Sequence, residues 1–100
     1  MSVRDMFFPA DRKFTKEEEM EFAKEELAYN VIADILVVME DLNITIPQLA
    51  EMVGKNRLYV TRILNGTQNM SIKMLSDICF VLKIKPEIKL TRIEDNEQRN

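Results

Sequence analysis

The sequence has no histidine and no tryptophan, only two glycines and three prolines, and a single cysteine among its 100 residues. Without histidine, the chain lacks the commonest general base and the usual nucleophilic triads, and most zinc sites are excluded. Glycine-rich phosphate loops are absent as well. We therefore expect no enzyme, no catalytic residue, no metal and no cofactor. The lone Cys79 cannot form an internal disulfide, which fits the reducing cytoplasm.

Long apolar segments are also missing. Purely apolar runs reach only five residues, as in Ile35–Met39, whereas a bilayer-spanning helix needs about 20. Residues 1–10 do not have the pattern of a secretory signal. The 46% hydrophobic content is enough for one small core, and the scarcity of glycine and proline predicts an all-α protein of the cytoplasm without a membrane segment.

The charged residues are divided unevenly along the chain. Residues 1–51 carry five basic and twelve acidic side chains, whereas residues 52–92 carry eight basic and two acidic ones. No acidic residue stands between Met52 and Ser76. A basic segment within a chain of net charge −3 indicates a nucleic-acid face on an otherwise acidic molecule.

Four helix starts are marked by residues that favour the N-cap position, namely Thr15, Thr45, Asn56 and Ser71. The first two also have Glu or Gln three residues later, which completes a capping box. The helices are expected from residue 15 to about 42, with one interruption left open, then over 45–53, 57–65 and 71–82. Ile88 and Leu90 alternate with Lys89 and predict a short C-terminal strand.

The middle of the chain has the spacing of a helix-turn-helix. Ala50 lies four residues before Gly54, and Val60 lies six residues after it. A small residue lets the two helices cross closely, the glycine lets the chain reverse, and the apolar side chains of Val60 and Ile63 hold the second helix on the core. Residues three and four apart share a helix face. The outward face of the second helix is therefore expected to carry Arg57, Leu58, Thr61, Arg62 and Asn65.

The strings Thr45–Gly54 and Tyr59–Gly66 resemble the λ-repressor-like (Xre-type) helix-turn-helix family. The resemblance implies a five-helix DNA-binding domain over residues 25–85. Residues 1–24 then form an N-terminal arm and the start of an acidic helix, and residues 86–100 form a C-terminal extension. Two positions depart from the family pattern: Lys55 replaces an apolar residue, and Leu58 replaces a residue that is often polar.

The resemblance also implies a role in DNA binding for particular residues. Arginine can donate twice to guanine, and Leu58 can contact a thymine methyl. The expected base contacts are Arg57, Leu58, Thr61 and Arg62. Phosphate contacts set register and orientation and read little sequence. The expected phosphate contacts are Gln48, Lys55, Asn56, Thr67, Asn69 and Lys73.

Three functions are compatible with this motif. The first is a transcriptional regulator, expected to be a repressor that binds double-stranded DNA as a homodimer on an inverted repeat. The second is an antitoxin that also binds a toxin protein, because Tyr59–Gly66 followed by Asn69–Leu82 resembles Hig-type antitoxins and related prophage regulators. The third, a protein-interaction module that no longer binds DNA, is disfavoured by the acid-free segment. The candidate dimer interfaces are Ile84–Ile93, which we favour, and Val31–Met39.

Overall fold

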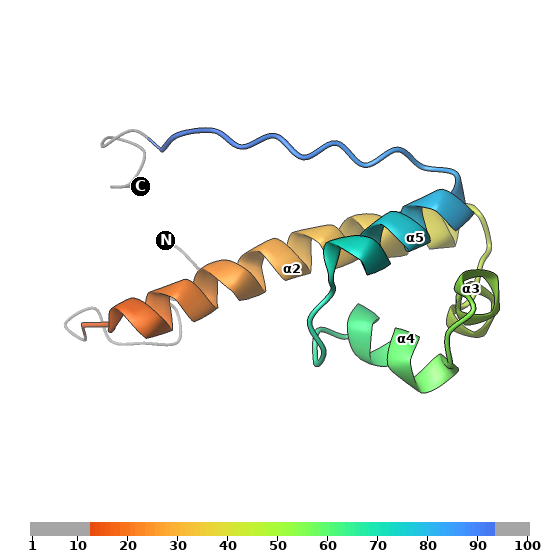
Figure 1. Cartoon of the computed structure of the whole chain (residues 1–100), viewed down its shortest axis with the longest axis horizontal. Helices are drawn as coiled ribbons and strands as arrows, with labels where there is room; N and C mark the ends of the chain where they lie inside the picture. The colour runs from red at the N-terminus through yellow and green to blue at the C-terminus, as the bar shows by residue number, and fades with distance from the viewer. Residues whose placement is uncertain (1–12, 94–100) are drawn as a thin grey trace.

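The computed structural model describes residues 13–93, which contain four α-helices and no strand (Figure 1). The predicted all-α class is therefore confirmed for this part of the chain. The helices are α2 (Lys16–Asp41), α3 (Ile46–Val53), α4 (Arg57–Leu64) and α5 (Ile72–Leu82).

Each helix begins directly after the residue expected to cap it: Thr15, Thr45, Asn56 or Ser71. In the first capping box, the Glu18 N–H donates to Thr15 Oγ1 at 3.1 Å, and the Thr15 N–H donates to Glu18 Oε1 at 2.9 Å. The box at Thr45 repeats this arrangement with Gln48. Because each cap satisfies amide groups that the first turn leaves unpaired, local sequence alone fixes where the helices start.

All four helices end in the same type of turn, in which one residue adopts a left-handed conformation. The left-handed residues are Asn43, Gly54, Gly66 and Lys83. After α5, for example, the Ile84 N–H donates to the Cys79 carbonyl at 2.9 Å and the Lys83 N–H donates to the Phe80 carbonyl at 3.2 Å. This pair of bonds defines the Schellman motif. Glycine adopts the left-handed region freely, whereas Asn43 and Lys83 adopt it at a conformational cost.

The hydrophobic core lies between the second half of α2 and the three shorter helices. Its buried members are Ile35, Met39, Leu49, Ala50, Val60, Ile63, Leu64, Met74, Ile78 and Leu82. Cys79 is buried as well. Burial raises the pKa of its thiol, so this side chain stays protonated at neutral pH and acts as a small apolar group.

The first half of α2 extends beyond the core (Figure 1). At 1.5 Å per residue, the 26 residues of α2 make a helix about 39 Å long, but its buried residues are only Ile35 and Met39. The side chains of Met20 and Leu27, in the first half, are 61% and 66% exposed. The helix also runs without interruption through the expected boundary between residues 24 and 25.

Three expectations about the architecture were wrong. Residues 25–85 contain four helices, not five, because no glycine or proline interrupts the chain between Thr15 and Leu42. Ile88–Leu90 forms no strand, since no neighbouring segment within residues 13–93 supplies the backbone hydrogen bonds that a strand requires. The segment Ile84–Ile93, favoured as a dimer interface because it had no evident core role, does not lack one entirely, since Ile84 packs against the core.

None of the helices within residues 13–93 combines the length and the apolar character needed to cross a membrane.

Candidate nucleic-acid interface

The turn between α3 and α4 has the geometry that the glycine spacing predicted. Gly54 caps α3 in the left-handed conformation, with φ 72° and ψ 32°. The Lys55 N–H then donates to the Ala50 carbonyl at 3.0 Å, and the Asn56 side chain caps the next helix. Three residues therefore separate the two helices, and α4 leaves the turn in a new direction (Figure 1).

The packing of α4 separates a core face from an outward face, as expected. Val60 and Ile63 are completely buried, and Ala50 of α3 is buried against the same core. Four residues of the other face are exposed and one is half-buried; the exposed ones are Arg57, Leu58, Arg62 and Asn65, and the half-buried one is Thr61. The structure thus brings all four expected base-contacting residues to one outward face of a helix whose other face packs in the core.

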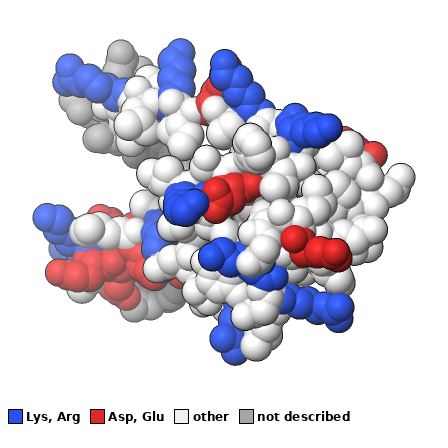
Figure 2. Space-filling model, turned by 45° about the vertical axis from the view of Figure 1, so that its right-hand side comes forward, with Lys and Arg blue, Asp and Glu red and all other residues white. Residues whose placement is uncertain are grey.

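Charges are partly separated in space as well as in sequence. In Figure 2, acidic side chains gather at the lower left, over the first half of α2, with a few more at the centre and on the right, and basic side chains extend from the bottom of the molecule, where α4 lies, and from its top. Lys55, Arg57 and Arg62 are the basic residues of the turn and of α4, and all three are exposed. A positive α4 surface that lies away from the acidic half of α2 suits a polyanion.

Two of the expected phosphate-contacting residues also serve as capping residues. Gln48 Oε1 accepts from the Thr45 N–H at 2.8 Å, and Asn56 Oδ1 accepts from the Tyr59 N–H at 2.7 Å. Each side-chain oxygen is thus used within the fold. An amide side chain still has two N–H donors, which are the groups that a phosphate would accept from.

The loop after α4 is held by its own hydrogen bonds. The Thr67 hydroxyl donates to Asn65 Oδ1 at 2.7 Å, and the Thr67 N–H donates to the same oxygen at 3.0 Å. Asn65 is also the C-cap residue of α4. Asn69 is exposed in this loop, and so is Gln68, a residue that sequence reasoning did not select. The sequence could have indicated Gln68 as a further phosphate contact, because its polar side chain stands between the expected contacts Thr67 and Asn69.

Lys73, the last expected phosphate contact, already has a partner. Its Nζ lies 3.2 Å from Asp77 Oδ2, one turn further along α5, and the Lys73 side chain is 83% exposed. Exposed ion pairs of this spacing stabilise a helix by only about 0.3–0.5 kcal/mol. A phosphate could therefore replace Asp77 as the partner of Lys73 at little cost.

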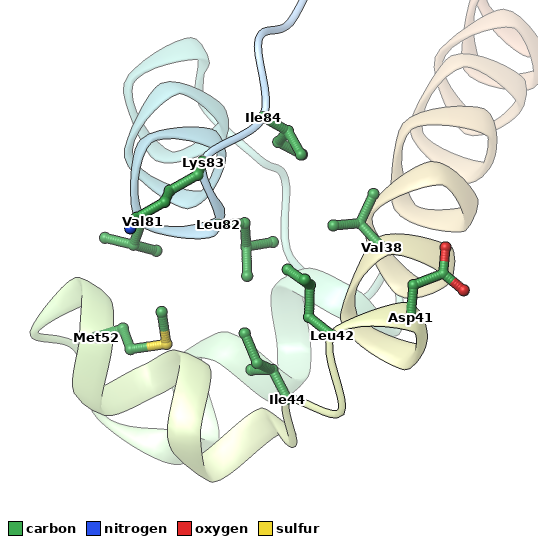
Figure 3. A pocket seen from close by; sticks show the side chains of 9 residues that line it. All are labelled: Val38, Asp41, Leu42, Ile44, Met52, Val81, Leu82, Lys83 and Ile84. Atoms are coloured by element: carbon green, nitrogen blue, oxygen red, sulfur yellow. The ribbon is translucent and has the colours of Figure 1, made fainter.

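Other features of the fold do not overlap with this surface. An open pocket of about 550 Å³ lies between the ends of α2 and α5 and the helix α3 (Figure 3), and none of the expected DNA contacts lines it. Its wall is mainly apolar, with Asp41 and Lys83 as the charged members. Among residues 13–93, no three histidine, cysteine or acidic side chains gather closely enough to hold a metal ion.

Comparison with known proteins yields one family match. The model of the Cro/C1-type HTH DNA-binding domain matches residues 34–87, more than half of the chain. The matched segment contains the last eight residues of α2, the whole helix-turn-helix and α5. No curated protein and no solved structure matches the chain.

Proposed function

The chain belongs to the Cro/C1-type helix-turn-helix DNA-binding family, and on that premise we propose that it is a sequence-specific transcriptional repressor that occupies an inverted-repeat operator. The observation that carries this proposal is the outward face of α4. It presents two exposed arginines, Arg57 and Arg62, on a helix whose opposite face is completely buried. In this family's mode of binding, such a helix enters the major groove, where arginine distinguishes guanine from the other bases.

The remaining candidate residues divide between bases and backbone. Leu58, 58% exposed, would contact a thymine methyl, and Thr61 would contact a neighbouring base. The expected phosphate contacts surround them, at the starts of α3 and α4, in the loop after α4 and on α5; they are Gln48, Lys55, Asn56, Thr67, Asn69 and Lys73. Such contacts would fix the register of α4 on the duplex.

A homodimer is part of this proposal. One helix-turn-helix reads only a few base pairs, and two-fold related copies double the site when their half-sites lie about one helical turn, or roughly 34 Å, apart. Selection of duplexes from a random pool by the full chain tests the function directly. We expect enrichment of an inverted repeat with this spacing. A pool that stays unenriched after several rounds would contradict the proposal.

The antitoxin function stays the alternative proposal, and the likeness to Hig-type antitoxins supports it only through the residues of α4 and α5. The surface that would serve a basic toxin is the acid-rich first half of α2, which the core leaves uncovered. The neighbouring gene distinguishes the two functions. A neighbour that encodes a small basic ribonuclease-like protein, captured by this chain when both are co-expressed, would favour the antitoxin.

A further inference from the structure

Two surfaces of the described chain are mostly exposed, and their charges are complementary. The first is the projecting half of α2, residues 16–29, and the second is the C-terminal arm, residues 85–93. We propose that the arm of each copy packs on the projecting half of α2 of a second copy, so that two reciprocal contacts hold the dimer. The inference deepens the proposed function and rests on it for the two-fold assembly.

The C-terminal arm is extended, basic and exposed. Its path is set at Lys85, because a residue before proline is restricted to extended conformations and Pro86 follows. All nine residues are exposed, and the side chains of Ile88, Leu90 and Ile93 are 68%, 91% and 65% exposed. Three basic residues stand beside a single acid, Glu87. Apolar side chains this exposed on a basic segment suit an acidic surface that has apolar side chains of its own.

The projecting half of α2 has those properties. It contains six glutamates and two lysines, and one of the lysines, Lys24, pairs with Glu21 at 2.7 Å. Met20 and Leu27 lie seven residues apart, on one side of the helix, and are mostly exposed. Glu19 and Glu26 have the same spacing and lie next to them. The result is an apolar row beside a row of carboxylates.

Electrostatics favours contact between the arm of one copy and the projecting half of α2 of the other over contact between two arms or between two projecting halves. Two projecting halves would bring glutamates against glutamates, and two arms would bring lysines against lysines. A ribbon of two arms would in addition be only marginally stable as an isolated pair of strands. Contact between arm and helix joins opposite charges, and two-fold symmetry then generates the contact twice.

The extent of the two surfaces also fits a dimer. Each copy supplies an arm of nine residues and a helical segment of fourteen, which is close to the 20–30 residues per partner in a stable interface. Within one chain, the arm runs back in the direction of the projecting half (Figure 1), yet all its residues stay exposed. The two surfaces are therefore available to a second copy.

Charge reversal provides the test. The arm variant is Lys89→Glu with Arg92→Glu, and the helix variant is Glu19→Lys with Glu26→Lys; all four positions are exposed, so the fold should be retained. Sedimentation of the full chain at micromolar concentration should show a dimer for the wild type. Each variant alone should dissociate, with its dimer dissociation constant raised by at least about tenfold. A mixture of the two should form heterodimers, because both reciprocal contacts again join opposite charges.

Every other result overturns the inference. A monomeric wild type would place the arm within its own chain or in solvent. Dimers that persist in both variants would place the interface elsewhere, and variants that dissociate without rescue on mixing would exclude the proposed pairing. Dissociation that occurs only when DNA is present would show that the arm contacts phosphate instead.

A matched control separates this inference from the proposed function. Lys55→Glu with Arg62→Glu changes the charge by the same amount as the arm variant, but on the α3–α4 side, and should remain dimeric while losing DNA binding. If the wild type dimerises through the arm but selects no DNA sequence, the proposed function fails and the dimer stands. If it selects DNA and charge reversal leaves the dimer intact, only the inference about the arm fails.

Discussion

Asn56 Oδ1 accepts a hydrogen bond of 2.7 Å from the backbone N–H of Tyr59, and this contact starts α4. The same residue is one of the proposed phosphate contacts. The two roles use different atoms. The side-chain oxygen caps the helix, and the side-chain N–H groups are the donors that a phosphate would accept from. A substitution that keeps an oxygen but removes the N–H groups therefore separates folding from DNA binding.

Asn56→Asp should leave stability unchanged or raise it by up to about 1 kcal/mol. The aspartate retains the cap, and its negative charge suits a helix N-terminus. DNA affinity should fall about tenfold or more, since the N–H donors are lost and a carboxylate would repel phosphate. Urea denaturation and fluorescence anisotropy measure the two effects. Thr15→Asp, which adds the same charge at the cap of α2, should leave DNA affinity within about twofold.

Gly54→Ala should destabilise the protein by about 1–2 kcal/mol through the backbone alone. The residue has φ 72°, a region that costs an L-residue about this much, and an added Cβ would meet no atom within 4 Å. Urea denaturation should therefore show a lower midpoint with an unchanged slope. Gly66→Ala, at φ 83° with equally open surroundings, should cost the same. Complete unfolding of either variant would contradict this account.

Lys83→Gly should stabilise the protein by about 0.5–1 kcal/mol. Lys83 ends α5 at φ 60°, so glycine would relieve the left-handed strain, part of which is offset by the greater freedom of glycine in the unfolded chain. Thermal denaturation measures the gain. Lys83→Ala keeps the Cβ and should change little. If it stabilises as much as glycine, the loss of the lysine side chain is responsible and the conformational explanation is wrong.

The helix starts could be predicted from the sequence because capping is local. Thr15 and Thr45 each bond with a residue three positions away, so a short string contains both partners. The helix ends near residues 42 and 82 were predicted as well, but the left-handed conformations of Asn43 and Lys83 were not, because neither residue favours that conformation as strongly as glycine. The predicted strand at Ile88–Leu90 is absent for a non-local reason. Alternation of apolar and polar residues describes a single strand, but a strand forms only when a neighbouring segment supplies backbone hydrogen bonds.

The candidate site was predictable to a similar extent. Helical spacing placed Arg57, Arg62 and Leu58 on the outward face of α4, and their exposure agrees with that placement. Lys73 and Asp77 stand four residues apart, a spacing at which helical side chains can pair, but only the structure shows the two side chains in contact. Which base each side chain contacts depends on the DNA and stays a prediction.

Lys73→Ala should weaken binding to all DNA sequences by a similar factor. Each phosphate contact contributes about 0.9 to the slope of log affinity against log salt, so loss of Lys73 should reduce that slope by about one per protomer. Anisotropy titrations at several salt concentrations measure it. Asp77→Asn should have the opposite, smaller effect on affinity, because it releases Lys73 from its partner at 3.2 Å. An unchanged slope would exclude Lys73 as a phosphate contact.

The most direct test of the central claim is the affinity ratio between a selected operator and a scrambled duplex, measured for the wild type and for Arg62→Ala. Arg62 is exposed on α4 and makes no contribution to the buried core, so its loss should leave the fold intact. If α4 reads bases in the major groove, the ratio should fall by about tenfold or more while affinity for the scrambled duplex changes much less, and preference should relax at one base position in each half-site. An unchanged ratio, or an equal loss of affinity for both duplexes, would contradict the proposed reading of DNA by α4.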